Sequence, residues 1–117
     1  MVNVHSYLAD SGILVFKLTG ELKIATAEES KDQIKAAIED KHPETVILEL
    51  SELTFLDSAG LAAFISAFKL LATIGGKLYV CNLKNQPKVI FEISNMQKII
   101  PAFPTLEDAL QHFGKKE

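Results

Sequence analysis

The strongest constraint on the fold of this chain is the alternation of strand-like and helix-like patterns along its sequence. Residues 45–50 are almost continuously apolar and rich in β-branched side chains, which is typical of a central strand covered on both faces. A helical pattern follows from about Ser58 to Thr73, and Lys77 to Leu83 forms another apolar run. Three successive strand-then-helix units predict an α/β domain with right-handed crossovers.

The N-terminal segment predicts an antiparallel strand pair beside that sheet. Residues 14–19 alternate between apolar and polar side chains, which is the pattern of a half-buried strand. Val2 to Leu8 is a suitable antiparallel partner, with a turn at Asp10-Ser11-Gly12 between them. The expected fold is therefore α/β, with a mainly parallel, mixed central sheet, an antiparallel N-terminal strand and about four helices.

The first long helix is predicted from Ala25 to Asp40. Thr26 and Glu29 have the spacing of a capping box, and His42-Pro43 stops the helix. In the helix that begins near Ser58, the apolar side chains at core-face spacing are Leu61, Phe64, Ile65, Phe68 and Ala72.

The C-terminal third predicts two further helices and a short strand. Pro87 suits the first turn of a helix, residues 98–100 resemble a short last strand, and Thr105 caps a final helix closed by Gly114. A chain of 117 residues is expected to form one domain. These patterns predict a single domain at residues 1–114 and a disordered tail at residues 115–117.

Composition excludes several classes of function. The net charge is −3 and the twelve basic residues are all Lys, so an arginine-based phosphate clamp or a nucleic-acid surface is not expected. The one cysteine, Cys81, cannot form an internal disulfide and is expected to be a small buried side chain. The apolar stretch from Ala59 to Ile74 is interrupted by Lys69 and is too short to span a bilayer. Without a targeting segment, the protein is expected to be cytoplasmic, with no membrane partner.

The segment that follows the central strand is the first place to look for function. We expect a loop at Ser51–Leu56, which leads to Asp57 and Ser58 at the start of a helix. Ligands and functional groups gather at the carboxyl ends of strands in such sheets. Because Ser and Asp are favoured N-cap residues, sequence physics alone favours a simple capping role for either Asp57 or Ser58.

The helix after Ser58 carries unusually little charge. Lys69 is the single charged side chain between Asp57 and Gly76. The side chains off its expected core face include Ala62, Ala63, Ala67 and Leu70. Part of this helix is therefore either buried between neighbouring elements or available to a partner.

The order of short motifs resembles the bacterial anti-sigma factor antagonists of the STAS domain family. The similarity lies in Asp57-Ser58-Ala59-Gly60-Leu61 after the central strand, and in Gly20-Glu21-Leu22 followed by residues 26–29. Gly75-Gly76-Lys77-Leu78 is similar to that family's return into the next strand. One position departs, because Lys23 stands where many members have an acidic residue.

The resemblance implies a phosphorylation switch. The serine at position 58 would be phosphorylated by an anti-sigma factor that is also a serine kinase, and a serine phosphatase would reset it. The unphosphorylated form, a monomer when free, would bind the kinase and release a sigma factor. The expected partner-binding residues are Glu21, Lys23, Thr26, Asp57, Ser58, Ala59, Gly60, Ala62 and Ala63.

Physical magnitudes are compatible with such a switch. A phosphate adds about −1.5 to −2 charge, and a helix N-terminus tolerates it. Burying that charge against an apolar partner costs several kcal/mol, comparable with the ~5.5 kcal/mol that moves a complex from mostly bound to mostly free. Asp57 would repel the phosphate, whereas Lys23 would favour it.

Two alternatives stay open at this point. The chain could be a constitutive STAS binding subunit of a signalling or lipid-transport assembly, in which Ser58 is only a helix cap. Catalysis is a remote third alternative, because Ser58 lacks the Gly-x-Ser-x-Gly context of a hydrolase. No phosphate-binding Gly-rich loop is present, so no cofactor is expected and the partner would supply the phosphate donor. The three histidines, His5, His42 and His112, lie far apart and are expected at the surface.

Overall fold

A five-stranded mixed sheet forms the centre of the protein, in the computed structural model that describes residues 2–9 and 12–114. The strand order is β1-β2-β3-β4-β5; β1 is antiparallel to β2, and the other neighbours are parallel. This arrangement confirms the predicted fold class. The strands are β1 (Val2–Leu8), β2 (Leu14–Leu22), β3 (Thr45–Leu56), β4 (Lys77–Cys81) and β5 (Ala102–Phe103). The helices are α1 (Ala27–Lys41), α2 (Ser58–Thr73), α3 (Asn85–Ile93) and α4 (Leu106–Gly114).

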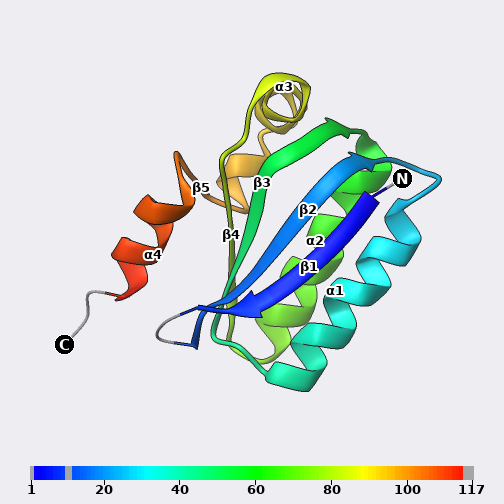
Figure 1. The fold of residues 1–117 in the computed structure, drawn as a ribbon. Helices are drawn as coiled ribbons and strands as arrows, with labels where there is room; N and C mark the ends of the chain where they lie inside the picture. The colour runs from blue at the N-terminus through cyan, green and yellow to red at the C-terminus, as the bar shows by residue number, and fades with distance from the viewer. Residues whose placement is uncertain (1, 10–11, 115–117) are drawn as a thin grey trace.

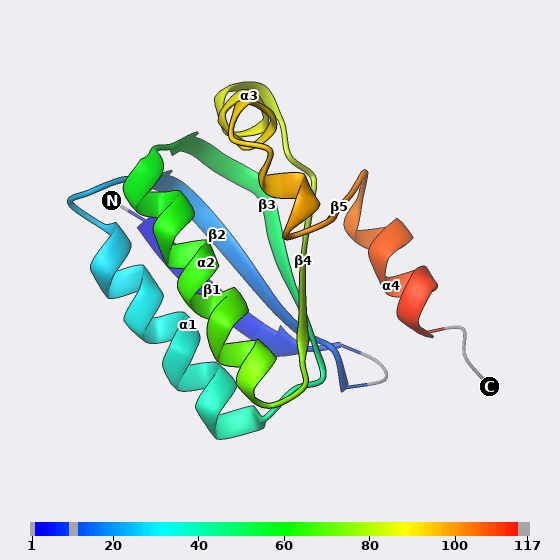
Figure 2. The ribbon, with the colours of Figure 1, turned by 180° about the vertical axis from the view of Figure 1, so that it is seen from behind.

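Helices cover the two faces of the sheet unequally. Figures 1 and 2 show α1 and α2 lying side by side across one face, whereas α4 lies at the side of β4 and β5. The larger apolar core lies under α1 and α2 and includes Phe16, Leu48 and Phe64. A smaller core on the other face joins Ile47 and Cys81 to α4. The carboxyl ends of β2 and β3, which contact the first turn of α2, therefore lie in the part of the sheet that helices cover.

Strand β3 is longer than expected. The predicted loop at Ser51–Leu56 is wrong, because β3 continues to Leu56 and stays paired with β2 as far as the Leu22–Leu56 pair. Two register shifts in this pairing let the strand bend while Leu53 and Leu56 remain buried. Strand β4 follows β3 only as far as the Glu49–Cys81 pair. In the described part of the chain, residues 50–56 of β3 therefore have a strand neighbour on one edge only.

Helix α1 begins without the predicted capping box. Thr26 occupies the N-cap position, but its side chain makes no cap hydrogen bond. Its hydroxyl instead donates to the carbonyl of Glu21 at 2.9 Å and accepts from the N–H of Lys23 at 3.1 Å. The helix ends at Lys41, immediately before His42-Pro43 as predicted, and the C-cap residue His42 adopts a left-handed conformation.

The buried face of α2 differs from the predicted one. Leu61 and Phe64 are buried as expected, Ile65 and Phe68 are half-buried, and Ala72 is exposed. Ala63, Ala67 and Leu71 are buried instead. The small alanines face inward because α1 packs alongside α2, so the buried arc of α2 covers both the sheet and α1.

The C-terminal part contains one wrong prediction. Residues 98–100 do not form a strand; a single 3-10 turn, Met96–Lys98, precedes Pro101, and β5 follows it. The predicted helix at Pro87 is confirmed as α3, and Thr105 caps α4 by accepting a hydrogen bond from the N–H of Asp108 at 3.0 Å. Strand β4 ends earlier than predicted, because Asn82 takes a positive φ of 59°. Part of the predicted turn, Asp10-Ser11, and the predicted tail at residues 115–117 lie outside the described residues.

Candidate functional site

Ser58 is the first residue of α2 and its side chain is exposed to solvent. It follows the carboxyl end of β3 with only Asp57 between them. The predicted position at the end of a parallel strand is therefore confirmed, although a strand end rather than a loop leads to it.

Asp57, and not Ser58, caps the helix. One carboxylate oxygen of Asp57 accepts a hydrogen bond from the N–H of Gly60 at 3.0 Å, and the other accepts from the N–H of Ile24 at 3.1 Å. The N–H of Asp57 donates to the carbonyl of Leu22 at 3.3 Å. One aspartate thus satisfies the helix start and ties it to the segment that joins β2 to α1. Of the two predicted capping residues, Asp57 is the one that caps the helix.

Gly60 lets the first turn of α2 lie against β2. A Cβ atom at this position would come within 2.6 Å of a methyl carbon of Leu56 and 2.8 Å of the carbonyl oxygen of Leu22. The glycine is buried, as is Ala63 one turn later, so these two predicted partner-binding residues lie inside the protein. That Gly60 and Ala63 contact a partner stays a prediction. In this structure, exposed neighbours such as Ala62 are more accessible to a partner.

The end of β2 and the segment that joins it to α1 carry three predicted residues, Glu21, Lys23 and Thr26. The ammonium of Lys23 forms an ion pair with Glu21, with 2.9 Å between Nζ and Oε1. The charge and hydrogen bond of Lys23 lower the pKa of the Glu21 carboxyl. Thr26 holds the same segment through its hydroxyl. Lys23 is thus engaged with Glu21, whose carboxylate partly neutralises it.

Ile24 was missed by the sequence analysis. Its side chain is 81% exposed, and its N–H is the group that Asp57 binds. The sequence did contain a clue, because Ile24 is a large aliphatic residue between β2 and α1 that belongs to the apolar pattern of neither. It stands at the mouth of a shallow groove of about 230 Å³ between α1 and α2, which Ala59 and Ala62 also line.

A glutamine from α3 reaches the same strand end. The backbone N–H of Leu56 donates to Oε1 of Gln86 at 2.8 Å, and Nε2 of Gln86 donates to the carbonyl of Leu56 at 2.8 Å. Gln86 therefore binds the residue that lies two positions before Ser58. No pattern in the sequence pointed to this contact.

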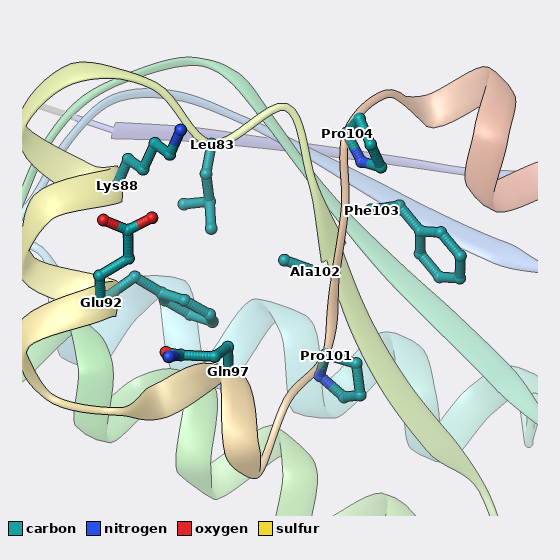
Figure 3. Close-up of a pocket in the computed structure, with 9 residues that line it drawn as sticks. Leu83, Lys88, Glu92, Gln97, Pro101, Ala102, Phe103 and Pro104 are labelled. Atoms are coloured by element: carbon teal, nitrogen blue, oxygen red, sulfur yellow. The ribbon is translucent and has the colours of Figure 1, made fainter.

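A larger hollow lies elsewhere and shares no lining residue with the Ser58 region. Figure 3 shows it between α3 and the segment that carries β5, with a volume of about 580 Å³. Lys88, Glu92 and Gln97 stand on one wall, and Ala102 points into it from the opposite side. The exposed serine and this hollow are separate features of the surface.

The other candidate groups do not assemble into a reactive centre. The side chains of His5, His42 and His112 are exposed, on β1, just after α1 and on α4 respectively. Among the described residues, no group of three or more His, Cys, Asp or Glu side chains could hold a metal ion. Cys81 is buried, and burial together with the charge of Glu49 raises the pKa of its thiol to about 12. No helix in the described part of the chain combines the length and the apolar character that crossing a bilayer takes.

The family assignment follows from comparison with known proteins. A family model for the STAS domain matches residues 7–109. The chain belongs to the STAS domain family. This assignment confirms the resemblance drawn from the motifs around Ser58.

Individual relatives of this STAS domain carry related names. An anti-sigma F factor antagonist of Paenibacillus polymyxa is 31% identical over 99 residues, covering 85% of each chain. The protein BtrV of Bordetella bronchiseptica is 33% identical over 102 residues, covering 87% of each chain. A crystal structure of an anti-sigma factor antagonist from Mycobacterium paratuberculosis superimposes with a TM-score of 0.86 at 24% identity, covering 98% of this chain and 96% of that one. This last likeness concerns the fold.

Proposed function

We propose that this STAS domain is an anti-sigma factor antagonist whose binding to a serine-kinase anti-sigma factor is switched by phosphorylation of Ser58. The observation that carries the proposal is the exposed serine at the start of α2, beside an aspartate that already caps the helix. The hydroxyl is accessible to a kinase, and the fold does not need it for capping. A relative that is 31% identical is named an anti-sigma F factor antagonist, which supports the same partner class.

The chemistry of the switch is a phosphoryl transfer that the partner performs. The Ser58 oxygen would attack the γ-phosphorus of ATP held by the kinase, the bond to the β-phosphate oxygen would break, and the hydroxyl proton would pass to a base of the kinase. The products are phosphoserine and ADP. A serine phosphatase would return the hydroxyl by hydrolysis.

The surroundings of Ser58 suggest that a phosphate would change partner binding without changing the structure of the domain. At the first residue of α2 the dianion would lie near free N–H groups and the positive end of the helix dipole. The Asp57 carboxylate lies next to it in sequence and opposes it. Because no arginine exists to fold over the phosphate, the added charge would act on the docked partner rather than on the domain itself.

The docking surface would combine the exposed apolar groups around the serine. Ile24 is largely exposed and lines the groove between α1 and α2, and Ala62 is exposed on α2. A partner that buries these groups would exclude water around Ser58. A phosphate placed there would have to be desolvated, which costs several kcal/mol unless the partner supplies a counter-charge.

The test pairs the purified protein with each histidine-kinase-type ATPase of the source genome in the presence of ATP. We expect one added phosphate by mass spectrometry, and none in Ser58→Ala. Ser58→Ala should bind the kinase continuously, and Ser58→Asp should bind at least roughly tenfold more weakly, which corresponds to about 1.4 kcal/mol. Ser6→Ala, at an exposed serine of β1 that does not line the groove, is the matched control and should behave as the parent.

The competing function is a constitutive binding subunit in which Ser58 has no regulatory role. In that case no kinase would add a phosphate, and Ser58→Ala and Ser58→Asp would bind their partner with the parent affinity. That result would reject the switch while leaving the STAS fold intact.

A further inference from the structure

Within residues 2–9 and 12–114, the end of β3 has no strand partner on the side away from β2. Strand β4 pairs with β3 only from Thr45 to Glu49, so in this described part the stretch from Leu50 to Leu56 has a backbone edge without a neighbouring strand. A bare strand edge leaves donors and acceptors unpaired. At Leu56, a side chain from another element binds the backbone N–H and carbonyl that a strand would otherwise pair.

Gln86 supplies the missing hydrogen bonds. Its amide accepts from the N–H of Leu56 and donates to the carbonyl of Leu56, both at 2.8 Å. This two-bond pattern is the one that a residue of a paired strand would give. On the other side, the next residue, Asp57, donates to the carbonyl of Leu22. The last residues of β3 are therefore held from two sides just before α2 begins.

The segment that carries Gln86 is itself anchored to β3. Asn82, which ends β4, donates from its side-chain amide to the carboxylate of Glu49 at 2.6 Å. Glu49 is buried and also accepts from the hydroxyl of Ser51 at 2.9 Å. The connection from β4 to α3 is thus tied to β3 at its first residue, Asn82, four positions before Gln86.

We propose that Gln86 is a positioning residue for Ser58. Its amide holds Leu56 in register, Asp57 then caps the first turn of α2 through Gly60, and Ser58 lies between these two fixed points. The inference rests on the proposed function, because it assigns Gln86 to the presentation of the serine to the kinase. It concerns a residue of α3, which the site motif does not contain.

The first arm of the test does not need a partner. Amide hydrogen exchange is measured by NMR on the full chain for the parent, Gln86→Ala and the control Gln97→Ala, which removes an exposed amide beyond the far end of α3. Gln86→Ala should accelerate exchange at Leu56 and through residues 57–61 by roughly tenfold or more, while residues 67–73 of α2 and the control stay unchanged. Acceleration at Leu56 alone, or uniform acceleration across the chain, would overturn the positioning role.

Gln86→Glu separates hydrogen bonding from shape. When ionised, the carboxylate faces the carbonyl of Leu56 with no proton to donate, and repulsion raises its pKa above the ordinary value of about 4.3. When protonated, it has both the donor and the acceptor of the glutamine amide. Exchange in Gln86→Glu should therefore be faster than in the parent at about pH 7.5, by no more than in Gln86→Ala because the carboxylate still accepts from the N–H of Leu56. It should move back toward the parent level on acidification to about pH 4.5, each measured relative to the parent at that pH. No return on acidification would contradict the proposal.

The second arm uses the kinase that phosphorylates the parent. Gln86→Ala should lower kcat by roughly tenfold and leave KM within about twofold, because the docking surface on α1 and α2 is intact while the serine is misplaced. A raised KM with an unchanged kcat would mean that Gln86 contributes to docking and not to positioning. If no kinase phosphorylates the parent, the proposed function fails, whereas the exchange measurements still decide whether Gln86 holds the start of α2.

Discussion

The carboxylate of Asp57 accepts a hydrogen bond at 3.1 Å from the backbone N–H of Ile24, a residue 33 positions earlier in the chain. The same carboxylate caps α2 through the N–H of Gly60. Asp57 therefore joins the two segments that flank the exposed serine. The geometry of the proposed docking surface depends on this one side chain.

Replacement of Asp57 by alanine should lower the free energy of unfolding, whereas replacement of Ser58 by alanine should leave it nearly unchanged. Asp57→Ala removes a cap and a charged hydrogen bond between segments, with an expected loss of about 2 kcal/mol in the free energy of unfolding. Ser58→Ala should change it by less than about 0.5 kcal/mol, because the serine does not cap the helix. Urea denaturation of both variants measures the difference. Equal losses would show that the serine shares the capping role.

Gly60→Ala should destabilise the protein although alanine is the better helix former. The added Cβ would meet the backbone carbonyl of Leu22 at 2.8 Å, and backbone cannot turn aside as a side chain can. We expect a net loss of roughly 1–2 kcal/mol, since the overlap outweighs the helix propensity gained. Ala62→Gly, at an exposed position of the same helix, calibrates that propensity. A more stable Gly60→Ala variant would contradict the close approach of α2 to β2.

Asn82 should be intolerant of alanine for two separable reasons. It takes a left-handed backbone conformation, and its amide binds the buried Glu49 carboxylate at 2.6 Å. Asn82→Ala should cost about 3 kcal/mol, and Asn82→Gly should cost about 1 kcal/mol less because glycine accepts that conformation.

Asn95 provides the control for the backbone part of this effect. It has a similar φ of 58° at an exposed position with no side-chain cap hydrogen bond. Asn95→Ala should cost only the backbone strain, about 1 kcal/mol. Thermal unfolding of the three variants compares them directly. Equal losses in Asn82→Ala and Asn95→Ala would mean that the bond to Glu49 contributes little.

Stability should fall at alkaline pH because of Cys81. Burial raises the pKa of its thiol from 9.0 to about 12, so the folded protein keeps this proton after the unfolded chain has lost it. Above about pH 9 the unfolded state binds fewer protons, and the free energy of unfolding should fall by up to about 1.4 kcal/mol per pH unit.

Cys81→Ala isolates the contribution of the thiol from other alkaline effects. The variant lacks the titrating group, so its stability should decline less steeply than that of the parent between about pH 8 and about pH 10. Urea denaturation at each pH gives the two slopes, and the shared titration of lysines cancels in their difference. Parallel slopes would show that the thiol is not protected from ionisation in the folded state.

Two wrong predictions were inferred from local spacing alone, namely the capping box at Thr26 and the strand at residues 98–100. The first was overruled by hydrogen bonds to residues a few positions earlier, and the second by pairing with a distant strand. Thr26 bonds back to Glu21, and the strand position is taken by residues after Pro101 that pair with β4. Ala63 and Ala67 were assigned to the outer side of α2 because the neighbouring helix could not be placed from the sequence.

The sequence by itself determined the order of strands and helices, the mixed sheet and the position of Ser58 at a strand end, because hydrophobic periodicity and turn residues act within short stretches of chain. The tertiary structure decided which residue caps α2, how far β3 extends and that Gln86 closes its free edge. These features depend on hydrogen bonds between segments about thirty positions apart. Such pairing depends on how the elements pack in space, which no local pattern encodes.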